Sequence, residues 1–288
     1  MAVEVNTWAG LQNSNNQGET VKWTGGDLDF NDIKPEGFTG AIKLYGSIDF
    51  QGATFRNFRH NGGYIYPDGC LNFLYTGNTY VKNLNFVNAI FNVDSSSISR
   101  GVIVFGSSSL YTGTVSNCRF DIDATISSST SATLFSVVRT TSYTGRTEFQ
   151  QCAFKVKAKN TTVNPINLFN INHADDCRFD IDIDTLYIYR EFESDSNGGM
   201  HNCEITGKVK IHSGTYYAKF GSASSNYNVY RVKDTGEQGV NTIVSNAGVS
   251  VYDNELMTLY NSTNAVGCTE AQLKSASYLN SIGFQIAT

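Results

Sequence analysis

Several features that mark familiar protein classes are missing from this 288-residue sequence. No apolar run approaches 18 residues, so we expect no transmembrane helix and no membrane partner. The opening MAVEVNTWAGLQNSNNQGE has neither a basic region nor an apolar region, so we do not expect a secretory signal peptide. Charged residues make up only 16%, and the net charge of −5 argues against nucleic acid as a partner.

Sequence signatures of several enzyme and cofactor-binding classes are also missing. The four histidines show no metal-ligand spacing such as HxxxH, and no GxSxG segment marks a hydrolase nucleophile. No Gly-rich loop of the phosphate-binding type is present. We therefore predict no metal ion and no cofactor.

The residues that are plentiful point to β-structure. The chain has 26 glycines, 16 tyrosines and 18 phenylalanines but only 3 prolines, and 40% of its residues are hydrophobic. Aromatic residues favour strands, and a chain of this length and hydrophobic fraction can form a sizeable core. The composition is typical of a β-rich protein with a polar, mostly uncharged surface.

One short pattern recurs through the middle of the chain. Its clearest copies are VSNCRFDIDAT, FQQCAFKVKAK, ADDCRFDIDID and MHNCEITGKVK, which carry Cys118, Cys152, Cys177 and Cys203 at their fourth place. The spacings are 34 (152 − 118), 25 (177 − 152) and 26 (203 − 177) residues. Upstream, Leu84 and Phe58 are assigned to the same place, and a degenerate copy follows near Val229. The repeat is therefore about 25 residues long, with insertions in two units.

Apolar and polar residues alternate within each copy. Phe179, Ile181 and Ile183 share the parity of Cys177, and the other copies follow the same pattern. Alternation with period two predicts a strand whose apolar side faces inward. A strand that recurs at this interval, with no helical segment between copies, predicts the stacked turns of a β-solenoid.

The outward positions of these strands form columns of alternating charge. Stacking the copies gives one column of Asp123, Lys157, Asp182 and Lys208, a second of Asp121, Lys155 and Asp180, and a third of Lys159, Asp184 and Lys210. In-register parallel stacking explains why the sign changes at each turn. We interpret the aspartates of CRFDIDIDTLYIYR as members of a structural charge ladder. Calcium binding or catalysis is the alternative, which the flanking lysines disfavour because they already neutralise the carboxylates.

The cysteines are interpreted as core residues rather than as disulfides. In a stack, Cys118, Cys152, Cys177 and Cys203 point in parallel, which is poor geometry for a disulfide bond. Small buried thiols fit such a column. Cys70 and Cys268 lie outside the repeat, and the sequence leaves their redox state open.

The two open ends of a solenoid need covers, which divides the chain into three parts. We predict an N-terminal cap and attachment segment over residues 1–39, a parallel β-helix of about seven coils over 40–255, and a C-terminal cap over 256–288. The first 40 residues and the C-terminal helix are the expected docking contacts.

Each cap has a recognisable sequence. In NTWAGLQN we expect Trp8 and Leu11 to point inward. The segment TEAQLKSASYLNSIGF predicts a helix that starts with a capping box of Thr269 and Gln272 and stops at Gly283.

The segments VKNLNF, VSNCRF and ADDCRF share the form apolar-x-Asn/Asp-apolar-x-Phe, and IDFQGATFRNF ends in the first four places of that form. Through them the chain resembles the right-handed parallel β-helix family, including the fibres, tailspikes and decoration proteins of phage particles. The opening VNTWAGLQNSNNQGETVKW is similar to the entry segments of such proteins. The resemblance implies an all-β fold, a right-handed parallel β-helix with a short N-terminal cap and a helical C-terminal cap. It is much less informative about function, because the same fold serves enzymes, virion components and adhesins.

Three classes of function stay open on this resemblance. The favoured one is a non-catalytic surface protein of a bacteriophage virion (capsid decoration, head fibre or tail-associated protein), made in the bacterial cytoplasm and released with the particle. Its partners would be other virion proteins, further copies of itself in a homo-oligomer such as a trimer, and bacterial surface glycans. The alternatives are a polysaccharide-degrading hydrolase or lyase and a bacterial surface adhesin.

The enzyme alternative requires acidic residues that converge on a substrate. The candidates are Asp175 and Asp176 beside His173, and Glu193 and Asp195 in REFESDS. We favour a simpler interpretation, in which these are turn residues that bond their own backbone. The adhesin and glycan-binding alternatives draw on aromatic rings that can stack on sugars. The clustered tyrosines are Tyr64, Tyr66, Tyr187, Tyr189, Tyr216, Tyr217, Tyr227 and Tyr230.

Overall fold

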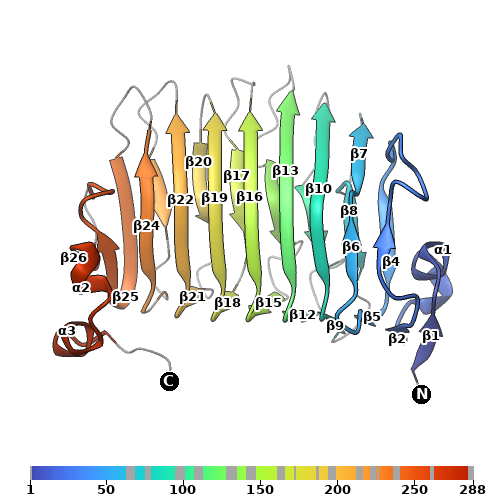
Figure 1. The fold of residues 1–288 in the computed structure, drawn as a ribbon, viewed down its shortest axis with the longest axis horizontal. Coiled ribbons are helices and arrows are strands. Elements are labelled where there is room, and N and C mark those ends of the chain that lie inside the picture. Colours follow the sequence, from blue (N-terminus) through green and yellow to red (C-terminus); the bar gives the residue numbers. More distant parts are fainter. Residues whose placement is uncertain are drawn as a thin grey trace.

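In the computed structural model, most of the chain forms parallel strands stacked in three sheets (Figure 1). The structure describes residues 2–62, 69–74, 79–94, 101–106, 113–127, 135–140, 147–160, 166–171, 173–185, 188–193, 199–211, 217–220, 225, 227–235, 241–259 and 263–284. Among these residues, no helix is both long and apolar enough to cross a membrane.

Each full coil contributes a strand to each of three sheets, A, B and C. Among the described residues, sheet A has eight strands: β1 (Val3–Val5), β2 (Thr20–Trp23), β5 (Ser47–Asp49), β9 (Thr79–Lys82), β12 (Gly113–Ser116), β15 (Thr147–Gln150), β18 (His173–Asp175) and β21 (Gly199–His201). In the same described part of the chain, sheet C has six strands: β4 (Ile42–Tyr45), β8 (Leu71–Leu74), β11 (Gly101–Phe105), β14 (Phe135–Thr140), β17 (Ile166–Asn170) and β20 (Ile188–Glu193).

Sheet B is the largest and forms the front of the molecule in Figure 1. Its strands are β3 (Leu28–Asp29), β6 (Thr54–Arg56), β7 (Arg59–Gly62), β10 (Asn85–Asp94), β13 (Arg119–Ser127), β16 (Ala153–Asn160), β19 (Arg178–Thr185), β22 (Glu204–Ile211), β24 (Val229–Asp234), β25 (Asn241–Asp253), β26 (Thr263–Cys268) and β23 (Tyr217–Phe220). Strands from successive coils pair in parallel, as in β13 with β16 and β16 with β19.

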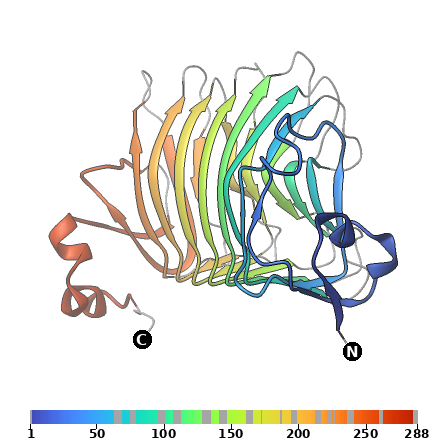
Figure 2. The same cartoon turned by 45° about the vertical axis from the view of Figure 1, so that its right-hand side comes forward.

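The coils wind in a right-handed sense. The chain runs along sheet C, crosses through sheet A, returns along sheet B and advances toward the C-terminal end (Figures 1 and 2). Right-handed crossovers are the rule between parallel strands of one sheet. Within the described residues, six coils have a strand in every sheet, since sheet C has six strands. The sequence predicted about seven coils, and partial turns at both ends supply the remaining strands.

The chain turns from sheet A into sheet B at a residue with left-handed backbone conformation. In successive coils, φ lies between 51° and 59° at Asn83, Asn117, Gln151, Asp176, Asn202 and Tyr227. Asparagine and aspartate adopt this conformation more readily than most residues. The turn therefore explains the Asn/Asp of the repeated pattern.

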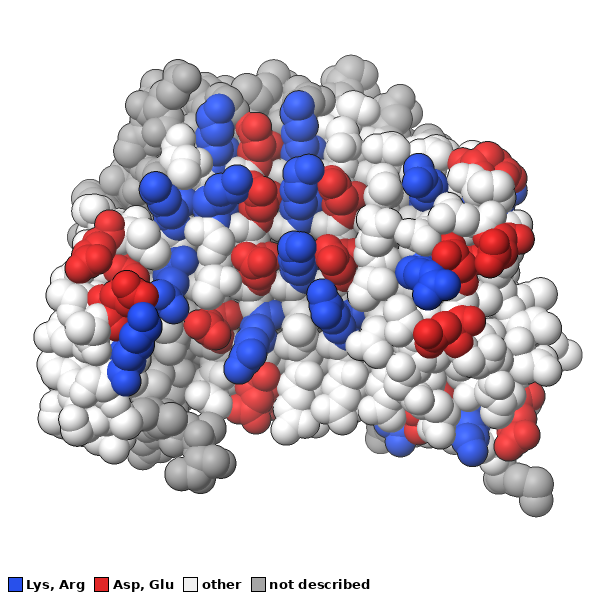
Figure 3. Space-filling model, in the orientation of Figure 1, with Lys and Arg blue, Asp and Glu red and all other residues white. Residues whose placement is uncertain are grey.

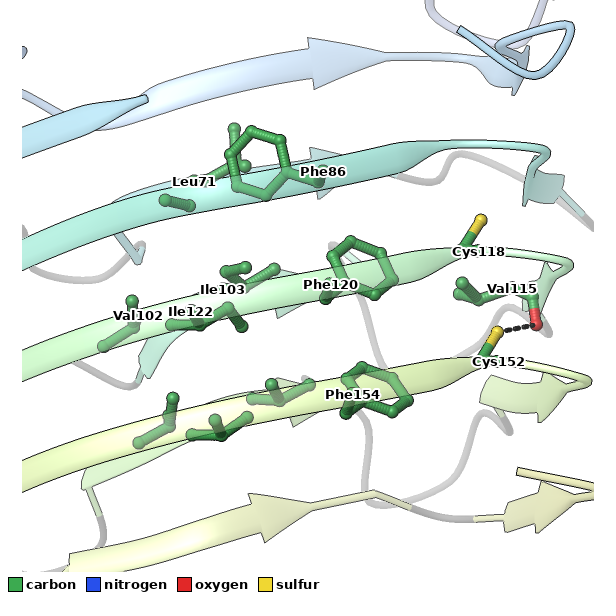
Figure 4. Close-up of a cluster of buried hydrophobic side chains, with 14 of the residues drawn as sticks. Leu71, Phe86, Val102, Ile103, Val115, Cys118, Phe120, Ile122, Cys152 and Phe154 are labelled. Carbon is green, nitrogen blue, oxygen red and sulfur yellow. Dashed lines mark hydrogen bonds between the residues drawn. The ribbon is translucent and has the colours of Figure 1, made fainter. Parts of the chain in front are cut away.

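Stacked phenylalanines fill the interior behind sheet B (Figure 4). Phe86, Phe120, Phe154 and Phe179 are aligned on consecutive strands and are at most 2% exposed. The ring centroids of Phe120 and Phe154 lie 5.3 Å apart with an interplanar angle of 12°. Those of Phe154 and Phe179 lie 5.2 Å apart with an interplanar angle of 4°. In-register stacking of the repeat places identical side chains in contact, which is why one residue type recurs at this position.

The cysteine column has a role beyond filling space. Each sulfur lies within hydrogen-bond distance of two backbone carbonyls. One is two residues earlier in its own coil, and the other is on the preceding coil: Val81 for Cys118, Val115 for Cys152, Phe149 for Cys177 and Ala174 for Cys203. Figure 4 shows the bond from Cys152 to Val115, 3.3 Å long. In the next coil Asn228 takes the cysteine position, and its Nδ2 donates to Met200 at 2.9 Å. Bonds from coil to coil thus continue where cysteine ends.

All six cysteines are free and buried, including Cys70 and Cys268, whose state the sequence left open. Burial raises the pKa of the Cys70 and Cys118 thiols well above that of an exposed cysteine, because a thiolate there would lose its hydration. The Cys70 and Cys118 thiols therefore act as small buried groups.

The prediction that Phe58 belongs to the column of Cys118, Cys152, Cys177 and Cys203 is wrong. Leu84 aligns with Ala53 on the preceding coil, whereas Phe58 aligns with Ala89. The error arises because Asn57, before Phe58, also has a left-handed backbone and resembles the corner residue in sequence. It belongs instead to an irregularity in sheet B, where Asn88 Nδ2 donates to Asn57 Oδ1 at 2.6 Å.

The N-terminal end is covered as predicted. Helix α1 (Trp8–Leu11) and the 3-10 turn η1 (Ser14–Asn16) connect β1 to β2. Trp8 and Leu11 are buried, and the Trp8 ring packs edge-on against Phe30 with centroids 4.9 Å apart.

Within residues 263–284, the C-terminal cap contains two short helices rather than one. Helix α2 (Glu270–Leu273) starts with the predicted capping box of Thr269 and Gln272. Ser275 then caps α3 (Ala276–Ser281), which is followed by Gly283 at φ +80°. Both helices stand beside the last coils (Figure 2), and α3 buries Leu279 against a small apolar cluster.

Candidate functional site

The outer face of sheet B carries the charge ladder in the register that the sequence pattern predicts. Blue and red side chains alternate across this face in Figure 3. Consecutive strands align Asp123 with Lys157, Lys157 with Asp182, and Asp182 with Lys208. The neighbouring columns pair Asp121, Lys155 and Asp180 on one side and Lys159, Asp184 and Lys210 on the other.

Several of these neighbours form ion pairs. Lys157 Nζ lies 3.2 Å from Asp123 Oδ2, and Lys208 Nζ lies 3.2 Å from Asp182 Oδ2. Lys155 Nζ lies 4.0 Å from Asp121. Because the Lys157 and Asp123 side chains are 63% and 46% exposed, each pair contributes about 0.2–1 kcal/mol. Pairing shifted by one whole coil would place like charges beside each other, so the ladder also favours the observed order of coils.

A reversal of charge in this column is expected to destabilise the protein. In Lys157→Asp, the new carboxylate faces Asp123 and Asp182, so we expect a loss of about 1–2 kcal/mol. In the swap Asp123→Lys with Lys157→Asp, one opposite pair is restored and only the contact with Asp182 stays repulsive. Urea unfolding should show that the swap recovers much of the loss. Equal stability of the single and double variants would contradict the stacking.

A second charge column, which the repeated sequence pattern did not reveal, lies on sheet A. The register aligns Glu4, Lys22, Asp49 and Lys82 on successive strands. Lys82 Nζ lies 3.1 Å from Asp49 Oδ2. Burial opposes the ionisation of Asp49, but hydrogen bonds from Asn83 and Gln51 outweigh it and lower its pKa. Alternating charge therefore organises two faces of the molecule.

The two best-placed acids of the enzyme alternative have different surroundings. Asp176 is the corner residue of its coil, and its Oδ1 accepts a hydrogen bond of 2.6 Å from Asn202 Nδ2. Asp175 lies on β18 with a side chain 35% exposed, and it contacts His173 Nε2 at 3.0 Å. Both carboxylates therefore have partners within the structure. The side chains of Glu193 and Asp195 lie outside the described residues.

Of the eight clustered tyrosines named from the sequence, the structure describes the side chains of two. Tyr230 is fully buried and aligns with Ile205 in the core, so it is no surface platform. Tyr227 is half-buried, and its ring meets Phe284 edge-on at 6.1 Å. The side chains of the other six predicted tyrosines lie outside the described residues.

Two histidines and an aspartate meet on the outer face of sheet A. His173, Asp175 and His201 each offer a ligand-type atom within 4.8 Å of the others. The rings of His173 and His201 have centroids 5.0 Å apart. Spacing rules along the chain missed this cluster because its members come from two coils.

A groove of about 580 Å³ separates the C-terminal helices from the corner between sheets A and B. Arg178, Arg231 and Lys274 line it together with Asp176 and Glu204. Its apolar side comes from the helical cap, including Leu279 and Phe284. A smaller hollow of about 360 Å³ lies over the sheet B ladder and is lined by its carboxylates and lysines.

Comparison with known proteins yields no relative: no family model, no curated protein and no solved structure matches the chain.

Proposed function

We propose that the chain is a non-catalytic structural protein on the surface of a phage virion, docked on other virion proteins and displayed to bacterial surface glycans. The observation that carries the proposal is that carboxylates on the outer face of sheet B are paired with lysines. On sheet B, the columns through Asp123 and Asp121 engage their carboxylates with lysines of the next coil. An enzyme face needs acids that converge on a substrate.

The candidate acids support the same proposal. Asp176 serves the backbone turn between two sheets, and Asp175 is held by a histidine of its own strand. Stacked parallel coils also give a stiff body, since strands inside the stack have neighbours on both sides. Stiffness and a face of paired charges suit a component that is built into a particle. The resemblance of the repeated pattern to phage fibres and decoration proteins supplies the setting.

The virion part of the proposal is tested on particles. Phage particles purified by density gradient from a culture that expresses the chain should contain it in fixed stoichiometry, and antibodies should label it on intact particles. Its absence from purified infectious particles would refute the virion assignment.

The non-catalytic part is tested on the purified chain. Incubation with capsular and cell-wall polysaccharides should release neither reducing ends nor unsaturated sugars. Release that disappears in Asp175→Asn or Asp176→Asn, but persists in Asp182→Asn as the matched ladder control, would establish the polysaccharide-degrading alternative instead.

A further inference from the structure

The cluster of His173, Asp175 and His201 is formed by two adjacent strands of sheet A. Register aligns Asp175 of β18 with His201 of β21, and His173 lies two residues before Asp175 on the same face. Ala174, the residue between them, points into the core and is fully buried. The two histidines are 28 residues apart in the chain (201 − 173), and only the stacking of coils unites them.

The geometry of the cluster is close to that of a metal site. His173 Nε2 lies 3.0 Å from the carboxylate of Asp175, and the donor atoms of all three residues lie within 4.8 Å of one another. Ligands bound tetrahedrally to zinc at 2.0–2.1 Å lie about 3.3 Å apart. The widest separation therefore has to close by about 1.5 Å, which a side-chain rotation of His201 can provide.

Burial favours ligation over a solvated surface contact. The His173 side chain is only 11% exposed, and its Nδ1 is buried without a hydrogen-bond partner among the described atoms. Asp175 is thus the group that orients this ring. The Asp175 side chain is 35% exposed, which leaves a route for an ion from solvent.

We propose that His173, Asp175 and His201 bind a divalent first-row transition-metal ion of the zinc type. Two imidazole nitrogens and one carboxylate are the donors that zinc takes, whereas calcium and magnesium require sites made mostly of oxygen. Three protein ligands leave a fourth position for water. The ion ties two consecutive coils together near the C-terminal end of the solenoid.

Binding to the folded chain alone raises its stability. With zinc at one hundred times its dissociation constant, the midpoint of thermal unfolding should rise by about 5 °C. Calcium and magnesium at the same concentration should leave it unchanged.

Calorimetric titration of the EDTA-treated full chain with zinc tests the site. One ion per chain should bind with micromolar affinity. His201→Gln and Asp175→Asn should each weaken binding at least tenfold, with circular dichroism unchanged because both side chains lie on the outer face. Asp182→Asn, an aspartate of the sheet B ladder, should bind zinc as the unmodified chain does.

Spectroscopy identifies the ligands directly and separates them from the six thiols. Cobalt bound at the site should show no thiolate-to-metal charge-transfer band, and zinc should shift the imidazole nitrogen resonances of His173 and His201 alone. Absence of zinc binding at millimolar concentration would overturn the proposal. So would full binding by His201→Gln and Asp175→Asn, or a thiolate band with cobalt.

Discussion

Replacing Phe154 with alanine should lower the free energy of unfolding by about 3–5 kcal/mol. The ring is 2% exposed and lies between Phe120 and Phe179, with centroids 5.3 and 5.2 Å away. It also meets Phe149 and Phe169 edge-on. Alanine would leave a cavity in the middle of the stack, which neighbouring coils cannot close without shifting their own strands.

Urea unfolding followed by circular dichroism measures this loss. Phe154→Leu keeps most of the volume and should cost about 1–1.5 kcal/mol. Val3→Ala, at a position 37% exposed, should change stability by less than about 0.5 kcal/mol. A loss below about 1 kcal/mol for Phe154→Ala would mean that the phenylalanines do not form the core.

Gly207→Ala should lower the free energy of unfolding by about 2–4 kcal/mol. Gly207 has φ +115° and aligns with Ile181 on the preceding coil. A Cβ at this position would overlap the backbone carbonyl oxygen of Ile181. Because backbone rather than a mobile side chain blocks the space, the two strands have to separate locally.

Alanine substitutions at two other glycines distinguish the cost of a positive φ from the cost of the clash with backbone. Gly52 has φ +80°, and a Cβ added there would meet no atom within 4 Å, so alanine should cost about 1 kcal/mol. Gly40 has open space and no positive φ, so alanine there should be nearly neutral. If Gly207→Ala lowered the free energy of unfolding no more than Gly52→Ala does, this would contradict the close approach of β19 and β22 at Gly207.

The part of the fold that the sequence predicts is the part with long strands. In β13, β16 and β19 the alternation persists for eight or nine residues, so parity and charge can be compared between copies. The sequence alone therefore places Asp182 and Lys157 beside each other. The corner conformation of Asp176 is harder to see, because a sequence pattern shows that a residue type recurs but not which backbone angle requires it.

The register of short strands is hard to predict from the sequence, because few residues are available to compare between copies. The sheet A column of Glu4, Lys22, Asp49 and Lys82 lies on strands of three or four residues, and its members are separated by unequal lengths of chain. Phe58 was misplaced for a related reason, since an asparagine in an irregular part of sheet B has the same backbone conformation as a corner asparagine.

A side-chain cluster whose members come from different coils also cannot be found by searching the sequence for motifs of fixed spacing. The His173 and His201 rings are in contact because one coil brings the chain back, so no fixed spacing could reveal them. The C-terminal helix was predicted with its cap but without its interruption at Lys274 and Ser275. Ser275 can accept a hydrogen bond from the backbone of Tyr278, which starts a second helix.

The stacking of successive coils in one register is tested most directly by a distance between two spin labels on the sheet B face. Asp123→Cys and Lys233→Cys place labels on β13 and β24, at aligned positions four strands apart. The native thiols are buried, so a chain without the new cysteines serves as the labelling control. Double electron–electron resonance should give a narrow distribution centred at about 19 Å, four times the spacing between strands. A centre displaced by about 5 Å would indicate one coil more or fewer, and a broad distribution beyond about 30 Å would contradict the stacked solenoid.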